Sequence, residues 1–197
     1  MSAERLFARP PGPIPPLMTS RFAVFAVTAL AAVPAFAVPA KKAAHPAEKP
    51  AASANGPKSI GKFDDWTAAT HQEAGANVCY AFTRAQSSSP SLPGRGPVIL
   101  TVTERPTGRD TVAMEVGFNF APNATTTVQV DQTGLEFYTD KRNAFARDGK
   151  AAVTAFSKGA RAIARSPGPK DATVTDTFSL RGFSLAYAAI VKACPPK

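Results

Sequence analysis

Three acidic residues, Glu104, Asp110 and Glu115, lie close together in the sequence and are of the type that an acid–base hydrolase uses. Such an enzyme needs two carboxyl groups that converge on one bond inside a cleft, with perturbed pKa values. Strand ends and solvent-facing strand positions carry acidic residues routinely, and these three fall in a strand-rich stretch. We therefore expect solvated side chains here and no active site.

The sequence offers no other catalytic pattern. Of the two histidines, His45 lies in an Ala/Pro/Lys-rich segment and His71 stands alone, so the ligand spacing of a zinc site is missing. The G-x-S-x-G nucleophile turn, the Walker loop and the dinucleotide fingerprint are also missing. We expect a protein that is not an enzyme and that uses neither a metal nor a cofactor.

The N-terminal part of the chain has the three parts of a secretory signal. Arg21 precedes an apolar run over residues 22–33, and Ala35-Phe36-Ala37 forms a small-x-small cleavage site. The apolar run is shorter than the roughly 20 residues of a transmembrane helix. We expect cleavage after Ala37, release into the periplasm or the medium, and at most peripheral membrane contact afterwards. The Pro-rich stretch before Met18 is a poor lead-in to a signal, so we expect translation to start at Met18.

Two cysteines, Cys79 and Cys194, lie near the two ends of the part that should fold. An exported protein folds in an oxidising compartment, where two such thiols form a bridge. A C-x-x-C redox motif is missing, so we predict a structural disulfide and not a catalytic one.

The rest of the chain divides into a tether and one domain. Residues 38–58 are rich in Ala, Pro and Lys and show no hydrophobic period, which is typical of a flexible tether. Residues 59–197 are long enough for a single domain with its own core. The net charge of the full chain is +9, which suits a basic exported protein and is also compatible with an anionic partner. Export and the lack of a nucleic-acid-binding motif exclude a nucleic-acid partner.

Alternation of apolar and polar residues with period two dominates the domain and predicts strands. The expected strands are 78–83, 98–103, 110–120, 126–131, 135–139, 161–165 and 173–180. The segment 86–97 should be a loop, Asp148-Gly149 a tight turn, and residues 151–158 a short helix. Phe183, Tyr187, Ile190 and Cys194 form the stripe of an amphipathic helix. The pattern favours a mainly β sandwich or barrel that is closed by a C-terminal helix.

Basic residues gather in the middle of the chain, where they are either scattered solvated charges or a surface for an anionic partner. Trp66, the single tryptophan, either packs at the edge of the domain or stacks on a ligand. The candidate binding patch that follows consists of Trp66, Arg142, Arg147, Lys150, Arg161 and Arg165.

Three segments resemble the invasion-associated locus B family. They are Phe63-Asp64-Asp65-Trp66, the pair Cys79-Tyr80, and the stretch 177–184 (TFSLRGFS) that runs on to Cys194. The resemblance extends from about Ile60 to the end of the chain. It implies a bacterial exported protein with an immunoglobulin-like β-sandwich, without established catalytic residues, and of a type associated with host-cell invasion in some pathogens. Many members have a further Cys shortly after the Trp motif, near the place where Thr70 stands here, so a second disulfide is not expected.

The function that these observations favour is binding. We expect a non-enzymatic cell-envelope protein that binds an envelope or host-surface component, and this partner would be anionic if the basic patch is its site. The alternative is a periplasmic module that binds a small ligand or inhibits an enzyme, which would show a concave pocket near Trp66 or Tyr138.

Overall fold

The computed structural model describes residues 56–197, which form eleven strands, two α-helices and a short 3-10 turn. The predicted signal segment, the start at Met18 and the tether up to residue 55 lie outside the described residues. The strands are β1 (Lys58–Phe63), β2 (Trp66–Glu73), β3 (Ala76–Arg84), β4 (Ser87–Ser89), β5 (Ile99–Arg105), β6 (Gly108–Glu115), β7 (Thr125–Val130), β8 (Thr133–Asp140), β9 (Asn143–Ala146), β10 (Arg161–Pro167) and β11 (Thr173–Ser179). The helical elements are α1 (Gly149–Lys158), the turn Pro169–Asp171 and α2 (Phe183–Ala193).

The eleven strands join one antiparallel sheet in the order β1-β2-β3-β5-β6-β9-β8-β7-β10-β11-β4. The sheet bends back on itself because one continuous segment of chain, β3 followed by β4, pairs with two strands that lie far apart in the strand order. β3 pairs with β5, and its continuation β4 pairs with β11. At the crossing, the Ala85 N–H donates to the Val98 carbonyl (2.9 Å) and the Gln86 N–H donates to the Thr177 carbonyl (2.8 Å).

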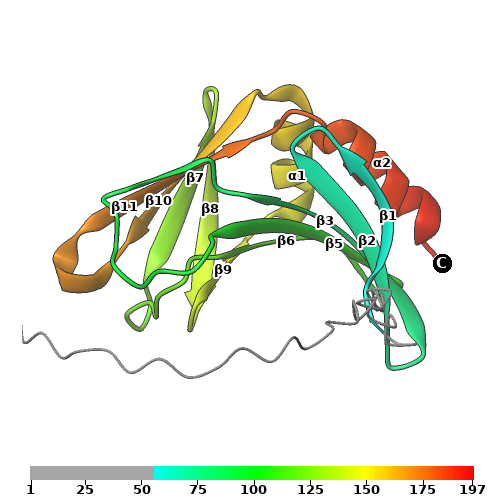
Figure 1. Cartoon of the computed structure of the whole chain (residues 1–197), viewed down its shortest axis with the longest axis horizontal. Coiled ribbons are helices and arrows are strands. Elements are labelled where there is room, and N and C mark those ends of the chain that lie inside the picture. The colour runs from blue at the N-terminus through cyan, green and yellow to red at the C-terminus, as the bar shows by residue number, and fades with distance from the viewer. Residues whose placement is uncertain (1–55) are drawn as a thin grey trace, which may run out of the picture. The chain divides into compact units, whose positions relative to one another are not determined.

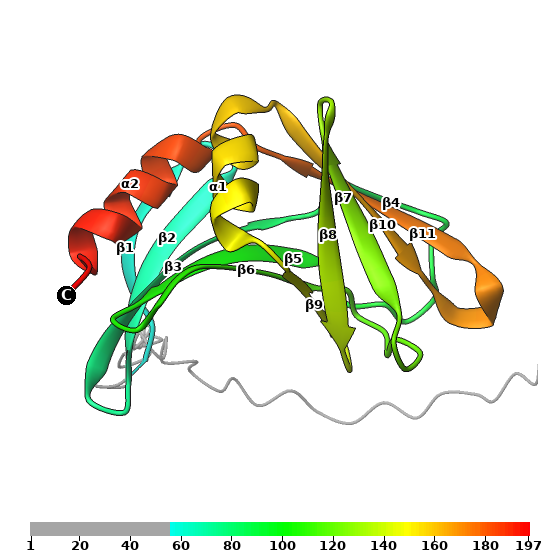
Figure 2. The same ribbon diagram turned by 180° about the vertical axis from the view of Figure 1, so that it is seen from behind.

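The bend produces two halves, one around β3, β5 and β6 and the other around β7, β8, β10 and β11, whose strands cross in both views (Figures 1 and 2). Their inner faces share one continuous hydrophobic core. The architecture is consistent with a β-sandwich, and the expectation of a mainly β fold with a C-terminal helix and one disulfide is confirmed.

Burial alternates along the strands with the predicted period of two. In β5 the inner positions are buried and the outer ones half-buried: Leu100, Val102 and Glu104 against Ile99, Thr101 and Thr103. The helices cover the inner face, since α2 packs against β1, β2 and β3 and α1 packs against β6 and β8. The side of the sheet that is turned away from both helices is called the outer face below.

The C-terminal helix α2 follows the predicted stripe. Phe183 and Ile190 are fully buried, and the Phe183 ring packs edge-on against Trp66 (centroids 4.8 Å apart) and Phe156 (5.6 Å). The contact of three aromatic rings fixes the first turn of α2 on the sheet. Within residues 56–197, neither helix combines the length and the apolar character that crossing a bilayer takes.

The predicted tight turn at Asp148-Gly149 is wrong, because these residues begin α1. The Asp148 carboxylate accepts a hydrogen bond from the Ala151 N–H (2.9 Å), which makes Asp148 the N-cap. A Cβ at Gly149 would lie 1.8 Å from the Asp110 carbonyl oxygen. Glycine is therefore required at this position by the close approach of α1 to the β5–β6 hairpin.

Three further boundaries differ from the sequence prediction. The strand expected over 110–120 ends at Glu115, because Gly117 has φ +79° and turns the chain out of the sheet. The loop expected over 86–97 contains β4, a strand of three serines that no hydrophobic alternation marks. The first strand begins at Lys58, one residue inside the predicted tether.

Candidate binding site

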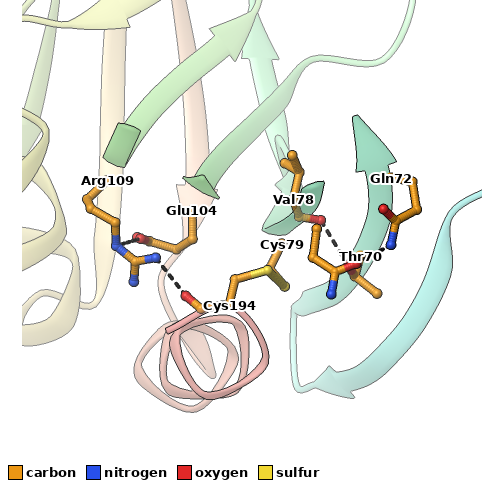
Figure 3. The surroundings of a disulfide bond; sticks show 8 residues. Thr70, Gln72, Val78, Cys79, Glu104, Arg109 and Cys194 are labelled. Carbon is orange, nitrogen blue, oxygen red and sulfur yellow. Dashed lines mark hydrogen bonds and ion pairs between the residues drawn. A yellow bond between two sulfur atoms is a disulfide. The ribbon is translucent and has the colours of Figure 1, made fainter. Parts of the chain in front are cut away.

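The predicted disulfide joins β3 to the end of α2. Cys79 and Cys194 are bonded, with their Cα atoms 5.9 Å apart and a sequence separation of 115 (Figure 3). Both cysteines are buried. The structure thus confirms the bridge, which pins the last helix onto the inner face of the sheet.

Glu104 lies beside this bridge and contradicts the expectation of a solvated side chain. It is 0% exposed. Its carboxylate lies 2.6 Å from Nε of Arg109 and accepts a hydrogen bond from the backbone N–H of Asp110 (3.2 Å). Arg109 also donates through Nη1 to the carbonyl oxygen of Cys194 (2.6 Å), so the β5–β6 hairpin holds the end of α2 (Figure 3).

Asp110 and Tyr187 complete this polar cluster. The Tyr187 hydroxyl donates to the Asp110 carboxylate (2.5 Å). Burial raises the pKa of Glu104 to about 7, and it also raises the pKa of Tyr187, with a further contribution from the hydrogen bond to Asp110. Glu104 is therefore a carboxylate with a raised pKa, of the kind that a hydrolase uses, but it is sealed from solvent and has no access for a substrate. The cluster anchors α2.

Glu115, the third acidic residue, lies on the outer face and does not join the other two. It is exposed, and its carboxylate lies 3.8 Å from Nη2 of Arg142. Alternation explains the separation, because Glu104 occupies an inner position of β5 and Glu115 an outer position of β6. The three carboxylates are close in sequence but do not converge.

Sequence reasoning missed a second buried ion pair, between Arg95 and Asp176. The guanidinium donates to both carboxylate oxygens (2.9 and 2.7 Å), and the side chains are 6% and 0% exposed. Ser88 donates to the same carboxylate (2.6 Å), and Arg95 Nε donates to the carbonyl oxygen of Val116 (2.6 Å). The pair locks β4, β11 and the end of β6 together where the sheet closes. Arg95 and Asp176 are 81 residues apart, so local spacing could not reveal it.

Aromatic side chains line up on the outer face. The register places five residues side by side on β3, β5, β6, β9 and β8: Phe82, Thr101, Ala113, Phe145 and Tyr138. Tyr138 is 45% exposed and stacks on Phe145 (centroids 5.4 Å apart), while Tyr80 stacks beside Phe82 (6.1 Å). Two aromatic pairs therefore flank a floor of short side chains.

Three hollows adjoin one another along this line, and together they are called the groove. The first, about 310 Å³, lies beside Thr67 and Phe82. The middle one, about 430 Å³, shares Phe82 and has Tyr80, Thr101 and Ala113 in its lining. The third, about 790 Å³, lies between the 119–123 loop and the β8–β9 hairpin. The last two share Glu115 and Asn143.

Charges along the groove balance. The lining of the three hollows contains four cationic and four acidic side chains: Lys62, Arg84, Lys141 and Arg142 against Asp64, Asp65, Glu115 and Asp140. The hydrogen bonds from Ser179 and Arg181 lower the pKa of Asp65, which keeps that carboxylate charged. The groove has no dominant sign of charge.

The structure distributes the predicted patch residues over different places. Trp66 is 0% exposed and donates through Nε1 to the Ser179 carbonyl (3.0 Å), so it belongs to the core and not to a surface patch. Arg142 lines the groove, and Lys150 is an exposed residue of α1. The remaining arginines are exposed on the second half of the sheet: Arg147, which pairs with Glu136 (2.9 Å), and Arg161 and Arg165 on β10.

Groups that hold metals do not gather in the described part of the chain, where no three His, Cys, Asp or Glu side chains lie together as ligands. His71 packs edge-on against Tyr80 (centroids 5.5 Å apart) on the outer face. The groove itself offers aromatic rings, hydroxyls, amides and balanced charges.

Comparison with known proteins identifies the family. The model of the family described as invasion associated locus B (IalB) protein matches residues 66–191. A search of curated proteins gives no match. Among solved structures, the crystal structure of invasion associated protein B from Bartonella henselae is similar, with a TM-score of 0.51 and 17% sequence identity, over 68% of this chain and 95% of that one. The structural likeness supports the fold, and the family match over most of the chain shows that it belongs to the invasion associated locus B (IalB) family.

Proposed function

We propose that this protein is an exported, non-catalytic binding protein of the cell envelope, and that its groove holds an envelope or host-surface component. The observation that carries the proposal is the row of aromatic and short side chains in register across five neighbouring strands. Side chains that need only pack the core lie on the inner face. Aromatic rings left partly exposed in a hollow are typical of a binding site.

The positions of the acidic residues support the non-catalytic part of the proposal. The carboxylate with a strongly raised pKa, Glu104, is sealed beneath α2. The carboxylates that line the groove, such as Glu115 and Asp140, are exposed. A catalytic acid needs both a matched pKa and access to a substrate, and Glu104 has no such access.

Export is supported by the signal-like sequence over residues 21–37 and by the disulfide, because such bridges persist in oxidising compartments. After cleavage at Ala37, 20 Lys and Arg against 13 Asp and Glu leave a net charge of +7, which would attract an anionic envelope or host surface at long range. This attraction differs from contact recognition, for which the charge-balanced groove is proposed.

The test is capture of envelope components by the purified, disulfide-bonded protein, compared with its Phe82→Ala and Tyr138→Ala variants. The matched control is Leu185→Ala, since Leu185 is a similarly exposed large apolar residue (62%) on α2, away from the groove. Phe82 lines the groove and Tyr138 lies beside it, paired with Phe145, so we expect both variants to lose capture and the control to retain it. Equal capture by all four proteins would reject the groove as the site.

A small-ligand or enzyme-inhibitory module is the second candidate, favoured by the size of the middle hollow. Its volume of about 430 Å³ falls within the range of small-molecule pockets. The same capture assay separates the two candidate functions. A free small molecule present in excess would displace a macromolecular partner only if both bind in the middle hollow.

A further inference from the structure

We infer that the groove binds a linear, uncharged oligosaccharide, an inference that rests on the proposed function and names its ligand class. Four features of the groove support it: the aromatic pairs, the floor between them, the polar end and the balance of charge.

The two aromatic pairs lie at a spacing that suits a chain of sugar rings, with Tyr80 and Phe82 in the lining of the middle hollow and Phe145 and Tyr138 in register beside it. Phe82 on β3 and Phe145 on β9 are separated by Thr101 and Ala113 on the two strands between. Three strand spacings amount to roughly 14 Å. The apolar C–H face of a pyranose ring packs on an aromatic face, so two platforms at this separation would hold two non-adjacent rings of one chain.

The backbone beneath the groove cannot recognise a peptide by strand addition. Each of β2, β3, β5, β6 and β9 already pairs with a neighbour on both sides. Their N–H and C=O groups are therefore committed to the sheet, and a ligand that crosses the strands must be recognised by side chains alone. Thr67 and Thr101 contribute hydroxyls to the lining of the hollows and Ala113 leaves room above the sheet.

The third hollow supplies groups that bind hydroxyls in pairs. Three amides gather in its lining: Asn119, Asn123 and Asn143. Asp140 and Arg142 lie beside them. Amide, carboxylate and guanidinium groups each present two adjacent hydrogen-bonding atoms, which match the neighbouring hydroxyls of a sugar.

The balance of charge favours a neutral ligand over a polyanion. Four cationic and four acidic side chains line the three hollows, so a uronate or phosphate chain would meet repulsion as often as attraction. The groove crosses six strands from β1 to β9, a span of roughly 24 Å or on the order of five sugar rings.

The experiment is calorimetric titration of the disulfide-bonded protein with neutral linear hexasaccharides of glucose, N-acetylglucosamine and mannose, with the corresponding disaccharides, and with hexagalacturonate. We expect at least one neutral hexasaccharide to bind more tightly than its disaccharide, and hexagalacturonate to bind more weakly. Raising the salt concentration should leave the affinity of the neutral chain unchanged, because no net charge is neutralised.

Two variants locate the site. Phe82→Ala removes one platform and should weaken binding at least about tenfold. Ala113→Arg leaves the inner face untouched but fills the floor between the platforms, so it should abolish binding in a protein whose circular dichroism is unchanged. Leu185→Ala should bind like the wild type.

The outcomes separate this inference from the function on which it rests. If no neutral hexasaccharide binds in the millimolar range, or if hexagalacturonate binds best and is displaced by salt, the inference is overturned. If in that case envelope capture still depends on Phe82 and Tyr138, the proposed function stands with another ligand class. If capture does not depend on them, both are rejected.

Discussion

The two faces of the β3–β5–β6 half carry similar residue types, but these side chains are enclosed on the inner face and accessible on the outer face. On the inner face, Glu104, Arg109 and the disulfide are enclosed by α2, and their polar atoms contact other protein atoms. On the outer face, Glu115 and Tyr80 lie in open hollows. A carboxylate with a raised pKa, Glu104, thus marks the anchor of α2, whereas the exposed carboxylate Glu115 lines the proposed groove.

The two arginine–carboxylate pairs of the inner side differ, because the Arg95 side chain is 6% exposed and that of Arg109 is 27% exposed. Asp176 receives both guanidinium nitrogens of Arg95 and the hydroxyl of Ser88. Glu104 receives one close nitrogen from Arg109 and a backbone N–H. The Arg95–Asp176 pair therefore holds together the strands where the sheet closes. The charge of Glu104 is compensated by fewer donors.

The largest effect should come from the disulfide. Replacing both cysteines (Cys79→Ser with Cys194→Ser) releases a loop of more than 100 residues, for which the chain-entropy estimate approaches about 5 kcal/mol. Urea unfolding of oxidised, reduced and double-variant protein measures the loss, and reductant should not affect the double variant. Equal stability of the oxidised and the fully thiol-titrated reduced protein would contradict a stabilising role.

The second-largest effect should come from Asp176→Asn, which should lower the free energy of unfolding by about 3 kcal/mol or more. The variant leaves the Arg95 guanidinium buried without its counter-charge, which is more costly than losing an exposed pair. The control is Glu136→Gln, which breaks the exposed pair with Arg147 and should cost less than about 1 kcal/mol. Urea unfolding measures both variants. Similar losses in the free energy of unfolding would show that the buried ion pair contributes no more to stability than the exposed one.

The pH dependence of the free energy of unfolding should reveal the raised pKa of Glu104. Since the folded-state pKa is raised to about 7 from 4.5, this group contributes stability below about pH 4.5 that is lost as the pH rises towards 7. Glu104→Gln removes this dependence, so relative to the wild type the variant should gain on the order of 1–3 kcal/mol between pH 4.5 and 8. Unfolding free energies of both proteins across this range provide the measurement, and parallel profiles would show that burial does not raise the pKa.

The smallest effect on stability should come from the outer face itself. Tyr138→Ala should change the free energy of unfolding by less than about 1 kcal/mol, because the ring is 45% exposed. Its neighbour in β8, Phe137, is fully buried on the inner face, and Phe137→Ala should cost about 3–5 kcal/mol. Comparable thermal shifts in the two variants would mean that the outer aromatic pair is structural.

Features that depend on near neighbours in the chain could be predicted from the residue pattern. Period-two alternation predicted most of the strands, and the i, i+4, i+7 stripe predicted α2. The combination of a signal-like N-terminus with two cysteines predicted the disulfide, and three short segments identified the family. Each of these signals lies within one element or depends only on the compartment, so it needs no knowledge of how elements pack.

Only the tertiary structure decided which residues meet. Arg95 reaches Asp176 because β3 continues into β4 and closes the sheet, and Glu104 becomes buried because α2 returns to cover β5–β6. The groove arises in the same way, since Phe82 and Tyr138 share one line only through the register of four successive strand pairs. Of the two alternatives for Trp66, packing and ligand stacking, long-range contacts decide for packing, since the ring is buried against Phe183. Long-range pairing sets these contacts, and a linear pattern of residue types does not encode it.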